Sequence, residues 1–554
     1  MIRQRLKETV DTCFQMGVEL GKWSDRGAGK YSVEVPKREG QGDFSTNMAM
    51  VLAGIEKCNP RQIAADFVSL LEQKDELIER LEIAGPGFVN VFIKESVWQD
   101  VLLTVFDRGG DFGRSEIGGG RRVMVEFVSA NPTGPLSIGH GRQAILGDSI
   151  ARLLEATGHD VFREYYFNDA GRQMRVLGES TRARYLELLG LDFEFPEDGY
   201  QGEYIKDIAQ SLVDKHGDGL KDESDTRPFT KQAEELIFKD IESTLSRMGI
   251  TFDNYYNEHS LYEEGHIDSV VDELRNKGLV YEKEGATWFK TTEFGQEKDR
   301  VIIKSTGEPT YRLPDIAYHR EKFRRNFDWL VDIFGADHIA TVPDVMAGVE
   351  ALGYDQSKVT VILHQFVTLT RDGKQVKMST RKATFVTVDE LLDMVGVDVA
   401  RFFFMMRKAD SQLEFDLGLA TREEKENPVY YVQYGHARLC SILRKAGEKG
   451  FAKKEAASVD LRLLNEPEEL QLLKSMAAFP ALIEDSALDL APHRLIFSLM
   501  EFAGHFHSYY NKHKVLDEAL SRELIEARLG LIDGLRIVLK NGLEMVGLTA
   551  PEKM

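Results

Sequence analysis

The fold is decided by the stretch Glu126-Phe-Val-Ser-Ala-Asn-Pro-Thr-Gly-Pro-Leu-Ser-Ile-Gly-His-Gly-Arg142. Residues 121–127, which lead into it, are rich in Val and Phe and predict a strand that the prolines and glycines end. Apolar residues then recur at helical spacing as far as Gly158, and residues 159–166 predict a second strand. Strand, loop, helix and strand in this order form the first crossover of a parallel α/β sheet.

The start of that helix has the features of a phosphate-binding site. It lies at the carboxyl edge of the sheet, where ligands bind, and it offers free N–H groups and the positive end of the helix dipole. Gly139 and Gly141 permit close approach to the backbone, and His140 adds a donor for a phosphate oxygen. The alternative is a histidine that only caps the helix. Two prolines and three glycines at one helix start favour phosphate binding.

The composition limits the class of protein. A length of 554 residues predicts about three or four domains, and an apolar content of 42% is enough for packed cores. No apolar run is long enough for a membrane, and the N-terminus has no signal peptide. The three cysteines form no metal-ligand pattern and are typical of a cytoplasmic protein. A net charge of −21 argues against a general nucleic-acid binder but allows docking through local basic patches.

Three units are expected along the chain. Residues 1–110 predict a small α+β domain, in which residues 42–47 open a helix. Residues 111–425 predict the sheet domain, with an acidic insertion at about 192–290 between its two halves, after which residues 301–304 resume strand character. Residues 426–554 predict an all-α bundle.

Two later stretches carry polar groups that suit a ligand site. Tyr311 and Asp315 share one face if Pro314 begins a helix, although a surface hydrogen bond is the usual outcome of such a pair. A buried strand over residues 329–334 leads directly to Asp337 and His338 at the same carboxyl edge.

Residues 371–384 form a basic, turn-rich loop. Five cationic side chains lie between Thr370 and Lys382. A mobile basic loop is what a polyphosphate needs in its transition state. The alternative is a solvated hairpin tip.

These motifs resemble those of class I aminoacyl-tRNA synthetases. The first stretch resembles their His-x-Gly-His motif, with Ser137 in place of the first histidine, and residues 126–132 resemble arginyl-tRNA synthetases in particular. Lys377-Met-Ser-Thr-Arg381 resembles the Lys-Met-Ser-Lys-Ser loop, with Thr380 in place of the second lysine and Arg381 or Lys382 as the source of the missing charge. The resemblance covers nearly the whole chain. It implies a Rossmann-like parallel-sheet catalytic domain between an N-terminal tRNA-contacting domain and an anticodon-binding helical bundle.

The resemblance also implies site residues. The catalytic set is Ser137, Gly139, His140, Lys377, Met378, Ser379, Arg381 and Lys382. The ATP-binding set is Gly134, Pro135, Ser137, Gly139, His140, Gly141 and Lys377. The arginine-binding set is Glu126, Ser129, Asn131, Tyr311, Asp315, Asp337 and His338. The tRNA-binding set is Phe44, Asn47, Tyr430, Tyr434 and Arg438, for whose aromatic rings burial in the core is the alternative. No resident metal site is implied.

The implied activity is that of an arginine–tRNA ligase. ATP, accompanied by Mg²⁺, activates L-arginine to arginyl-adenylate, and the arginine passes to the 3′ end of tRNA by positioning and charge stabilisation. The protein is expected to be a cytoplasmic monomer without membrane contact. One alternative is a non-catalytic tRNA-binding paralogue, which Ser137 and Thr380 support. The other is an adenylate-forming ligase for another amino acid, against which Glu126, Tyr311 and Asp315 argue.

Overall fold

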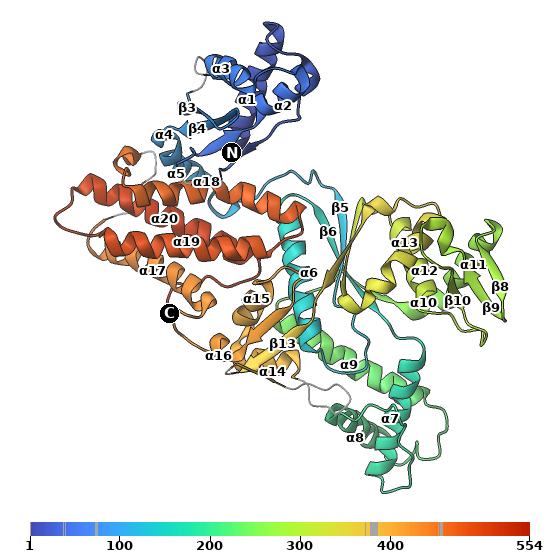
Figure 1. The fold of residues 1–554 in the computed structure, drawn as a ribbon. Helices are drawn as coiled ribbons and strands as arrows, with labels where there is room; N and C mark the ends of the chain where they lie inside the picture. The colour runs from blue at the N-terminus through green and yellow to red at the C-terminus, as the bar shows by residue number, and fades with distance from the viewer. Residues whose placement is uncertain are drawn as a thin grey trace.

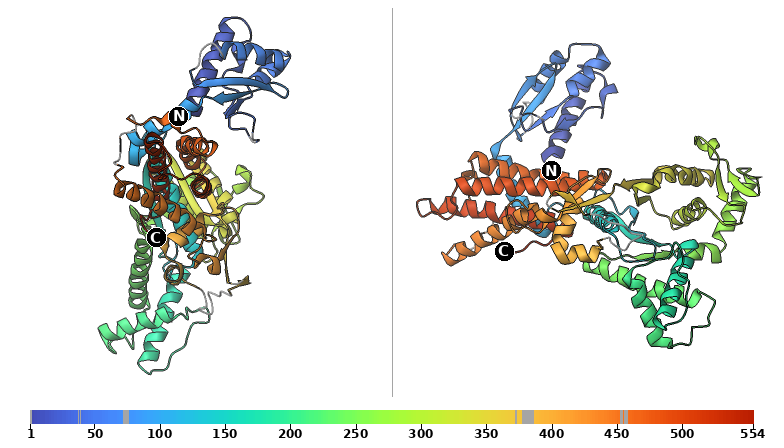
Figure 2. Two further views of the ribbon diagram at one scale, coloured as in Figure 1. Left: turned by 90° about the vertical axis from the view of Figure 1, so that its left-hand side faces the viewer. Right: turned by 60° about the horizontal axis from the view of Figure 1, so that its bottom comes forward.

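Three parts follow one another along the chain, and the arrangement confirms the expected fold class. The computed structural model describes residues 2–36, 38, 40–71, 76–371, 373–376, 386–451, 454 and 458–554. A small α+β part and an α/β part are both attached to a helical bundle (Figure 1). Figure 2 shows the N-terminal part standing on the bundle and the α/β part extending from it in another direction.

The N-terminal part is an antiparallel sheet of order β1-β2-β4-β3 packed against three helices. Its elements are α1 (Ile2–Glu19), η1 (Asp25–Gly27), β1 (Val33–Glu34), β2 (Phe44–Thr46), α2 (Met48–Glu56), α3 (Pro60–Leu71), β3 (Ile78–Ala84) and β4 (Phe88–Ile93). The helix that residues 42–47 were expected to open is present as α2, with Asn47 as its N-cap residue. Residues 44–46 before it form strand β2, which pairs with β4 and was not predicted.

The α/β part is built on a five-stranded parallel sheet of order β12-β11-β5-β6-β7. Its first half contains β5 (Arg122–Glu126), α6 (Ile138–Ala156), β6 (Asp160–Phe167), α7 (Arg172–Leu188), α8 (Glu203–His216), α9 (Arg227–Arg247), β7 (Asn254–Asn257), α10 (Glu258–Glu263) and α11 (His266–Asn276). Its second half contains β8 (Val280–Lys283), β9 (Ala286–Phe289), η3 (Thr291–Phe294), β10 (Arg300–Ile303), α12 (Arg312–Arg324), β11 (Trp329–Gly335), η4 (Ala336–Ala340), α13 (Val342–Ala351), η5 (Gln356–Lys358) and β12 (Val359–His364).

One expectation about this part needs correction. The segment 192–290 is not wholly an insertion, because it contains β7, which pairs with β6 as the fifth strand of the parallel sheet. The strand character expected at residues 301–304 is confirmed by β10, which pairs with β9 in a separate antiparallel sheet of order β10-β9-β8. The sequence of β7 is Asn-Tyr-Tyr-Asn, so an apolar pattern did not reveal it.

The chain then crosses to the bundle. The crossing elements are β13 (Val367–Arg371), β14 (Lys374–Gln375), α14 (Val388–Val395), α15 (Val397–Met405), β15 (Leu413–Asp416) and α16 (Leu417–Ala420). The bundle consists of α17 (Pro428–Glu448), η8 (Leu461–Leu463), α18 (Pro467–Leu488), α19 (His493–Lys512) and α20 (Arg522–Met545). The linking helices α4 (Glu95–Gln99) and α5 (Val101–Arg108), followed by η2 (Gly109–Asp111), pack against α18 and α20.

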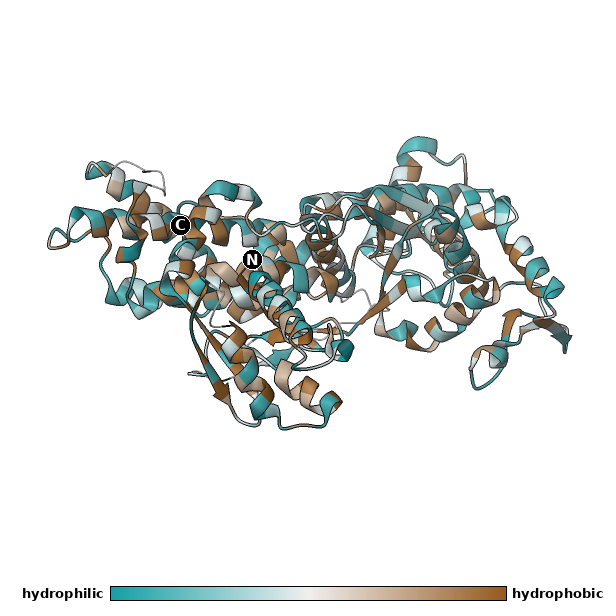
Figure 3. Cartoon of the chain, turned by 90° about the horizontal axis from the view of Figure 1, so that it is seen from above, coloured by the Kyte–Doolittle hydropathy of each residue, from teal (hydrophilic) through white to brown (hydrophobic). Residues whose placement is uncertain are grey.

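The elements bury their apolar faces inward. Figure 3 shows hydrophobic and hydrophilic residues alternating around the helices, as amphipathic helices do. None of the helices in the described part of the chain combines the length and apolarity that crossing a bilayer requires.

Helix α6 lies between the sheet and the bundle and is tied to both. The guanidinium of Arg142 in its first turn donates to the carbonyls of Gln365, Lys408 and Ser411, at 2.6, 2.8 and 2.9 Å. These carbonyls follow β12 and α15, so the start of α6 is fixed to the crossing segment.

A second buried arginine joins three helices. Arg401 on α15 is fully buried, and its guanidinium donates to the Asp148 carboxylate on α6 and to the carbonyls of Met248 and Val546, beyond the ends of α9 and α20. Gly547, at φ 72°, permits this approach, because a Cβ there would lie 2.4 Å from Arg401 Nη2.

Replacing this arginine should destabilise the whole protein. In Arg401→Ala, Asp148 is left as a buried, under-compensated carboxylate, so we expect a loss of roughly 3–5 kcal/mol in the free energy of unfolding, measured by urea denaturation. The control is Arg152→Ala, which removes a partly exposed partner 2.7 Å from the same carboxylate; that change should cost under about 1 kcal/mol. Equal losses in the two variants would contradict the role assigned to Arg401.

Candidate functional site

Ser137 and His140 together cap the start of α6. Ser137 is the N-cap: its hydroxyl accepts from the N–H of His140, and its own N–H donates to His140 Nδ1 at 3.3 Å. This is a capping box with histidine in the position usually held by Glu or Gln. His140 therefore caps the helix through Nδ1, which agrees with the alternative interpretation of the sequence. Its other ring nitrogen, Nε2, takes no part in the capping box.

His140 is a neutral donor at physiological pH. Burial lowers its pKa to about 4, while the nearby charge of Asp337 acts in the opposite direction. Since Nδ1 accepts from the backbone, the ring proton resides on Nε2, and that N–H is free to meet a ligand oxygen. The predicted residues His140 and Asp337 are thus brought within electrostatic range of each other.

The predicted glycines have different surroundings. A Cβ on Gly139 would meet only the hydroxyl of Ser137, at 3.7 Å, so this position leaves the backbone open. A Cβ on Gly141 would lie 2.9 Å from Val388, and one on Gly134 would lie 2.9 Å from the hydroxyl of Tyr204. The absence of a Cβ therefore allows the close approach of α14 at Gly141 and of α8 at Gly134. The approach of a ligand to the Gly141 backbone stays a prediction.

The predicted basic loop can be located only by its flanks. Lys377, Met378, Ser379, Arg381 and Lys382 lie outside the described residues, so their predicted roles are not tested. Downstream of them, Val388 N donates to Leu136 O at 2.9 Å, and Thr387 forms a bridge with Ser137. The end of the basic loop is therefore attached directly to the start of α6, next to Pro135.

Three neighbouring strands carry a row of buried carboxylates. Asp332 on β11, Glu126 on β5 and Glu164 on β6 lie in register across the sheet. Helix α12 covers them with cations: Lys322 bonds Glu126 and lies 2.6 Å from Asp332, and Arg325 lies 2.6 Å from Glu164. Although burial opposes ionisation, Lys322 and His319 hold the pKa of Asp332 below its usual range. These charges fasten α12 to the sheet.

Glu126 takes part in this pairing. Its side chain is 2% exposed, with one carboxylate oxygen accepting from Lys322 and the other from the Ser129 hydroxyl at 2.9 Å. These bonds hold α12 and the loop after β5 in place. Each carboxylate oxygen can accept a second hydrogen bond, so direct binding of a ligand by Glu126 stays a prediction.

The loop after β5 has a strained backbone. Val128 and Ser129 have φ values of 68° and 40°, which are unfavourable for residues other than glycine and above all for valine. The Ser129 hydroxyl also accepts from Tyr166 N at 3.1 Å, which joins the loop to β6. Asn131 donates to Gln173 at 2.5 Å, so its carbonyl oxygen is the part left for a ligand.

Asp315 on α12 and Glu258 at the start of α10 form a pair of acidic side chains, called the acidic pocket below, which the sequence revealed only in part. Burial raises the pKa of Asp315 to about 7; His319 opposes this shift, and the charges of Glu258 and Glu126 add to it. Glu258 follows β7 directly, is 7% exposed and has a raised pKa, chiefly because of burial. Sequence reasoning missed Glu258 because β7 was not predicted.

The remaining predicted ligand residues lie around this pocket and along the sheet edge. Tyr311 is the N-cap residue of α12 and is 73% exposed, so its convergence on a ligand stays a prediction. Asp337 and His338 are exposed in η4 at the carboxyl end of β11. His364, which sequence reasoning missed, ends the neighbouring strand β12, and burial lowers its pKa to about 4.

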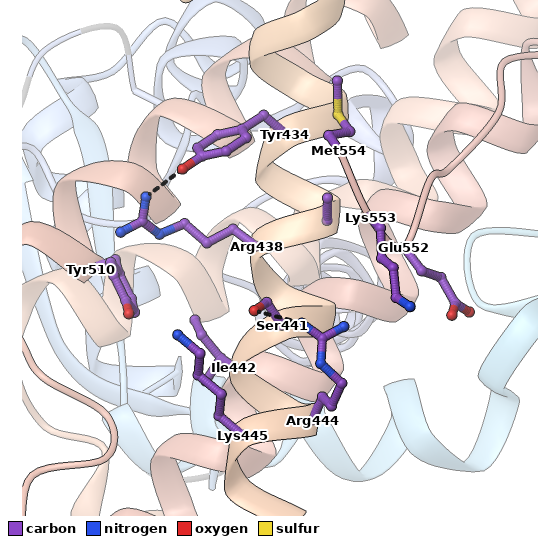
Figure 4. Close-up of a pocket in the computed structure, with 11 residues that line it drawn as sticks. Tyr434, Arg438, Ser441, Ile442, Arg444, Lys445, Tyr510, Glu552, Lys553 and Met554 are labelled. Atoms are coloured by element: carbon purple, nitrogen blue, oxygen red, sulfur yellow. Dashed lines mark hydrogen bonds between the residues drawn. The ribbon is translucent and has the colours of Figure 1, made fainter.

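A cavity of about 460 Å³ in the bundle is lined by two of the predicted tRNA-binding residues (Figure 4). The Tyr434 hydroxyl accepts from Arg438 at 2.9 Å, and the Arg438 guanidinium lies 4.3 Å from the ring centre of Tyr510. Tyr430 stacks on Tyr434 from outside this lining, with ring centres 6.1 Å apart. Basic residues and the end of the chain complete the wall: Arg444, Lys445, Lys553 and Met554.

The two predicted RNA contacts of the N-terminal part stand differently: Phe44 is buried, and the contact by Asn47 stays a prediction. The ring of Phe44 is buried and stacks on Trp98 at 6.3 Å, so the prediction that it stacks on a base is wrong and its core alternative holds. The Asn47 side-chain oxygen accepts from Ser32 N at 2.8 Å, which leaves only its NH₂ group for a base.

Comparison with known proteins accounts for all three parts. The arginyl tRNA synthetase N terminal domain matches residues 1–93, the class I (R) tRNA synthetase catalytic domain residues 109–416, and the DALR anticodon binding domain residues 432–554. Over 554 residues the chain is 73% identical to an arginine–tRNA ligase of Desulfotalea psychrophila, with 100% of both chains covered. The chain belongs to the arginyl-tRNA synthetase family.

Further relatives of this synthetase family agree in length and fold. An arginine–tRNA ligase of Citrifermentans bemidjiense is 49% identical, with 99% of this chain and 100% of the relative covered. The solved structure of Thermus thermophilus arginyl-tRNA synthetase has a TM-score of 0.76, with 100% of both chains covered and 22% sequence identity. That likeness shows a shared fold.

The acidic pocket should destabilise the ligand-free synthetase as pH rises. The pKa of Asp315 is raised to about 7, so its protonated form fits the fold, and the stability it contributes is lost between about pH 4 and pH 7. We expect Asp315→Asn to have a higher unfolding temperature than the wild type at pH 8 and a similar one at pH 4.5.

The control for this prediction is Glu297→Gln, which alters an exposed carboxylate. It should follow the wild type at both pH values. An Asp315→Asn protein that is no more stable than the wild type at pH 8 would show that the carboxylate is not strained in the free protein.

Proposed function

We propose that this chain activates L-arginine with ATP to arginyl-adenylate and transfers the arginine to the 3′ end of tRNA. The observation that carries the proposal is an acidic pocket, formed by Asp315 and Glu258, at the same end of one sheet as an open helix start. A guanidinium is always charged and suits buried carboxylates, and a phosphate suits a helix N-terminus. Full-length likeness to arginine–tRNA ligases supports the same activity.

In the proposed reaction the chain works by positioning and by fixed charge. The amino acid's guanidinium enters the acidic pocket, and its carboxylate points toward the start of α6, where it attacks the α-phosphate of ATP and pyrophosphate leaves. The Nε2–H of His140 donates to phosphate oxygens as negative charge shifts during attack. No side chain forms a covalent intermediate, and Lys377 with Arg381 or Lys382 neutralises the leaving pyrophosphate.

Magnesium, location and oligomeric state complete the proposal. The one group of three metal-type ligands found among the described residues is Glu466, Glu468 and His513 in the bundle. Lys512 and His513 already bond Glu468, so the group does not fit a resident ion, and Mg²⁺ enters with ATP. Three cysteines that lie far apart in the sequence and form no metal-ligand pattern support a cytoplasmic location. One chain supplies the helix start, the pocket and the bundle cavity, which supports a monomer.

Neither alternative function is favoured by the structure. A non-catalytic tRNA-binding paralogue was supported by Ser137, but that serine serves as a well-formed N-cap. A ligase for another amino acid would not need two buried carboxylates without a counter-ion in its pocket.

One assay tests the proposed function. Purified protein should exchange pyrophosphate into ATP when arginine and tRNA are both present, and the family resemblance implies that tRNA is required. It should also charge tRNA with arginine but not with lysine or citrulline. Absence of arginine-dependent exchange with tRNA present, from protein that is folded by circular dichroism, would overturn the proposal.

The two roles of His140 can be separated. Gln at the third helical position retains a capping box, whereas Ala does not. We expect His140→Gln to keep the wild-type unfolding temperature while kcat for adenylate formation falls ~10²-fold with little change in KM for ATP, because the contact strengthens in the transition state. His140→Ala should lose activity and also stability, about 1 kcal/mol. Normal kcat in His140→Gln would mean that the imidazole only caps the helix.

The bundle cavity should bind an unstacked base of the anticodon. We expect Tyr434→Ala to weaken tRNA binding by ~1–3 kcal/mol, since an aromatic ring that stacks on a base contributes about this much. Tyr434→Phe is the control, because it keeps the ring and removes only the hydroxyl that Arg438 bonds. The measurement is the tRNA dissociation constant at fixed salt. Unchanged affinity in folded Tyr434→Ala would exclude stacking at this residue.

A further inference from the structure

A hydroxyl group from the crossover between β6 and β7 is bonded to the loop that leads into α6. Tyr204 lies in the first turn of α8, and its hydroxyl donates to the carbonyl of Thr133 at 2.6 Å. Thr133 lies between β5 and α6, in the stretch that ends at the capping box. Burial raises the pKa of Tyr204, so the hydroxyl keeps its proton and acts as a donor.

The ring of Tyr204 fits between two glycines. A Cβ on Gly134 would lie 2.9 Å from the hydroxyl oxygen of Tyr204 and 3.0 Å from the ring carbon that carries it, and a Cβ on Gly202 would overlap the ring. The ring also packs against the main hydrophobic core. Because it is enclosed on several sides, the ring holds its hydroxyl in one place.

The two halves of the loop between β5 and α6 are held by different elements. Strand β6 holds the first half, where the Tyr165 hydroxyl donates to Ala130 O at 2.8 Å. In the second half, residues 131–135, the bonds that other described elements make come from the crossover, through Gln173 on α7 and Tyr204 on α8. The bond of Gln173 is exposed, so water competes for it, and Tyr204 is the firmer support.

Helix α8 can act as a support because it is itself fixed. The backbone N–H of Tyr200, just before α8, donates to the Ser180 hydroxyl on α7 at 3.0 Å. At the other end of α8, the Tyr185 hydroxyl on α7 donates to Gly217 O at 2.7 Å. Buried apolar residues of α7, α8 and α9 form a core of their own, so these three helices are one packed unit (Figure 1).

We propose that Tyr204 is a positioning residue for the reaction at the start of α6, and that it holds the second half of the preceding loop where the substrates bind. The inference rests on the proposed function, in which Asn131 of this loop is a ligand residue. The loop begins with Val128 and Ser129 in an unfavourable backbone conformation, which persists only where the surroundings hold it. Without the Tyr204 bond, the loop adopts its binding position for a smaller fraction of the time, and the apparent affinity for arginine falls by that fraction.

The test compares Tyr204→Phe with Tyr185→Phe in arginine-dependent pyrophosphate exchange with tRNA present. Each change removes only a hydroxyl that bonds a carbonyl, and both hydroxyls belong to the same crossover. In Tyr204→Phe we expect KM for arginine to rise about threefold to tenfold, the effect of one neutral hydrogen bond. Its kcat should stay within about twofold of the wild type, because bound arginine restores the loop position. Tyr185→Phe should keep both constants while losing at least as much thermal stability.

Hydrogen exchange of the ligand-free protein reports on the loop itself. The backbone amides between Asn131 and Leu136 should exchange about threefold to tenfold faster in Tyr204→Phe than in the wild type, because opening of the loop then breaks one bond fewer. In Tyr185→Phe these amides should exchange at the wild-type rate. A purely structural role of Tyr204 would lower the unfolding temperature without this local difference.

The outcomes separate this inference from the proposed function. A higher KM for arginine together with faster loop exchange, both confined to Tyr204→Phe, supports the inference. Wild-type KM in Tyr204→Phe, an equal rise of KM in both variants, or a higher KM with unchanged loop exchange overturns it, while the proposed function stands. If the wild type shows no arginine-dependent exchange, the proposed function fails, and hydrogen exchange decides by itself whether Tyr204 holds the loop.

Discussion

The bonds made by the buried guanidinium of Arg401 hold the site in one piece. They bring together the middle of α6, the end of α9 and the end of the last bundle helix, which are distant in sequence. Because the guanidinium is planar and always charged, it satisfies a carboxylate and two carbonyls in fixed directions. Helix α6, whose start is the proposed phosphate site, is thus anchored through its body to the bundle that contains the proposed tRNA cavity.

The carboxylates around α12 fall into two groups: those paired with a cation inside the fold and those of the acidic pocket. Acids that hold the sheet and α12 together each have a cation within bonding distance, and their charges are satisfied before any ligand arrives. Within the described ranges, no ion pair joins a cation to Asp315 or Glu258, and burial raises the pKa of both carboxyl groups. We therefore assign the carboxylates that have a cationic partner to the framework, and we propose the other two as ligand groups.

The sequence predicted the elements whose pattern is local and strong. The strand, loop and helix around residues 126–156 follow from prolines, glycines and apolar spacing, and the order of the three parts follows from composition and motif. What the sequence could not supply depends on distant pairing. Strand β7 is short and polar, and only its pairing with β6 identifies it as a strand. Glu258, which follows β7 directly, was therefore not predicted as a site residue. The bond between Glu126 and Lys322 was not foreseen either, because Lys322 lies far along the chain. Phe44 was taken for a base-stacking residue because its burial against Trp98 is equally non-local.

The capping box at Ser137 changes what the departure from the family motif means. A serine hydroxyl is among the best N-cap groups, whereas an imidazole is a poor one, so position 137 contributes to the geometry on which the next histidine depends. Restoring a histidine there would bring the sequence closer to the family pattern and take away the group that fixes His140 N–H. A substitution at 137 therefore acts on His140 as well, because it removes one of the two bonds of the capping box that holds the imidazole at the start of α6.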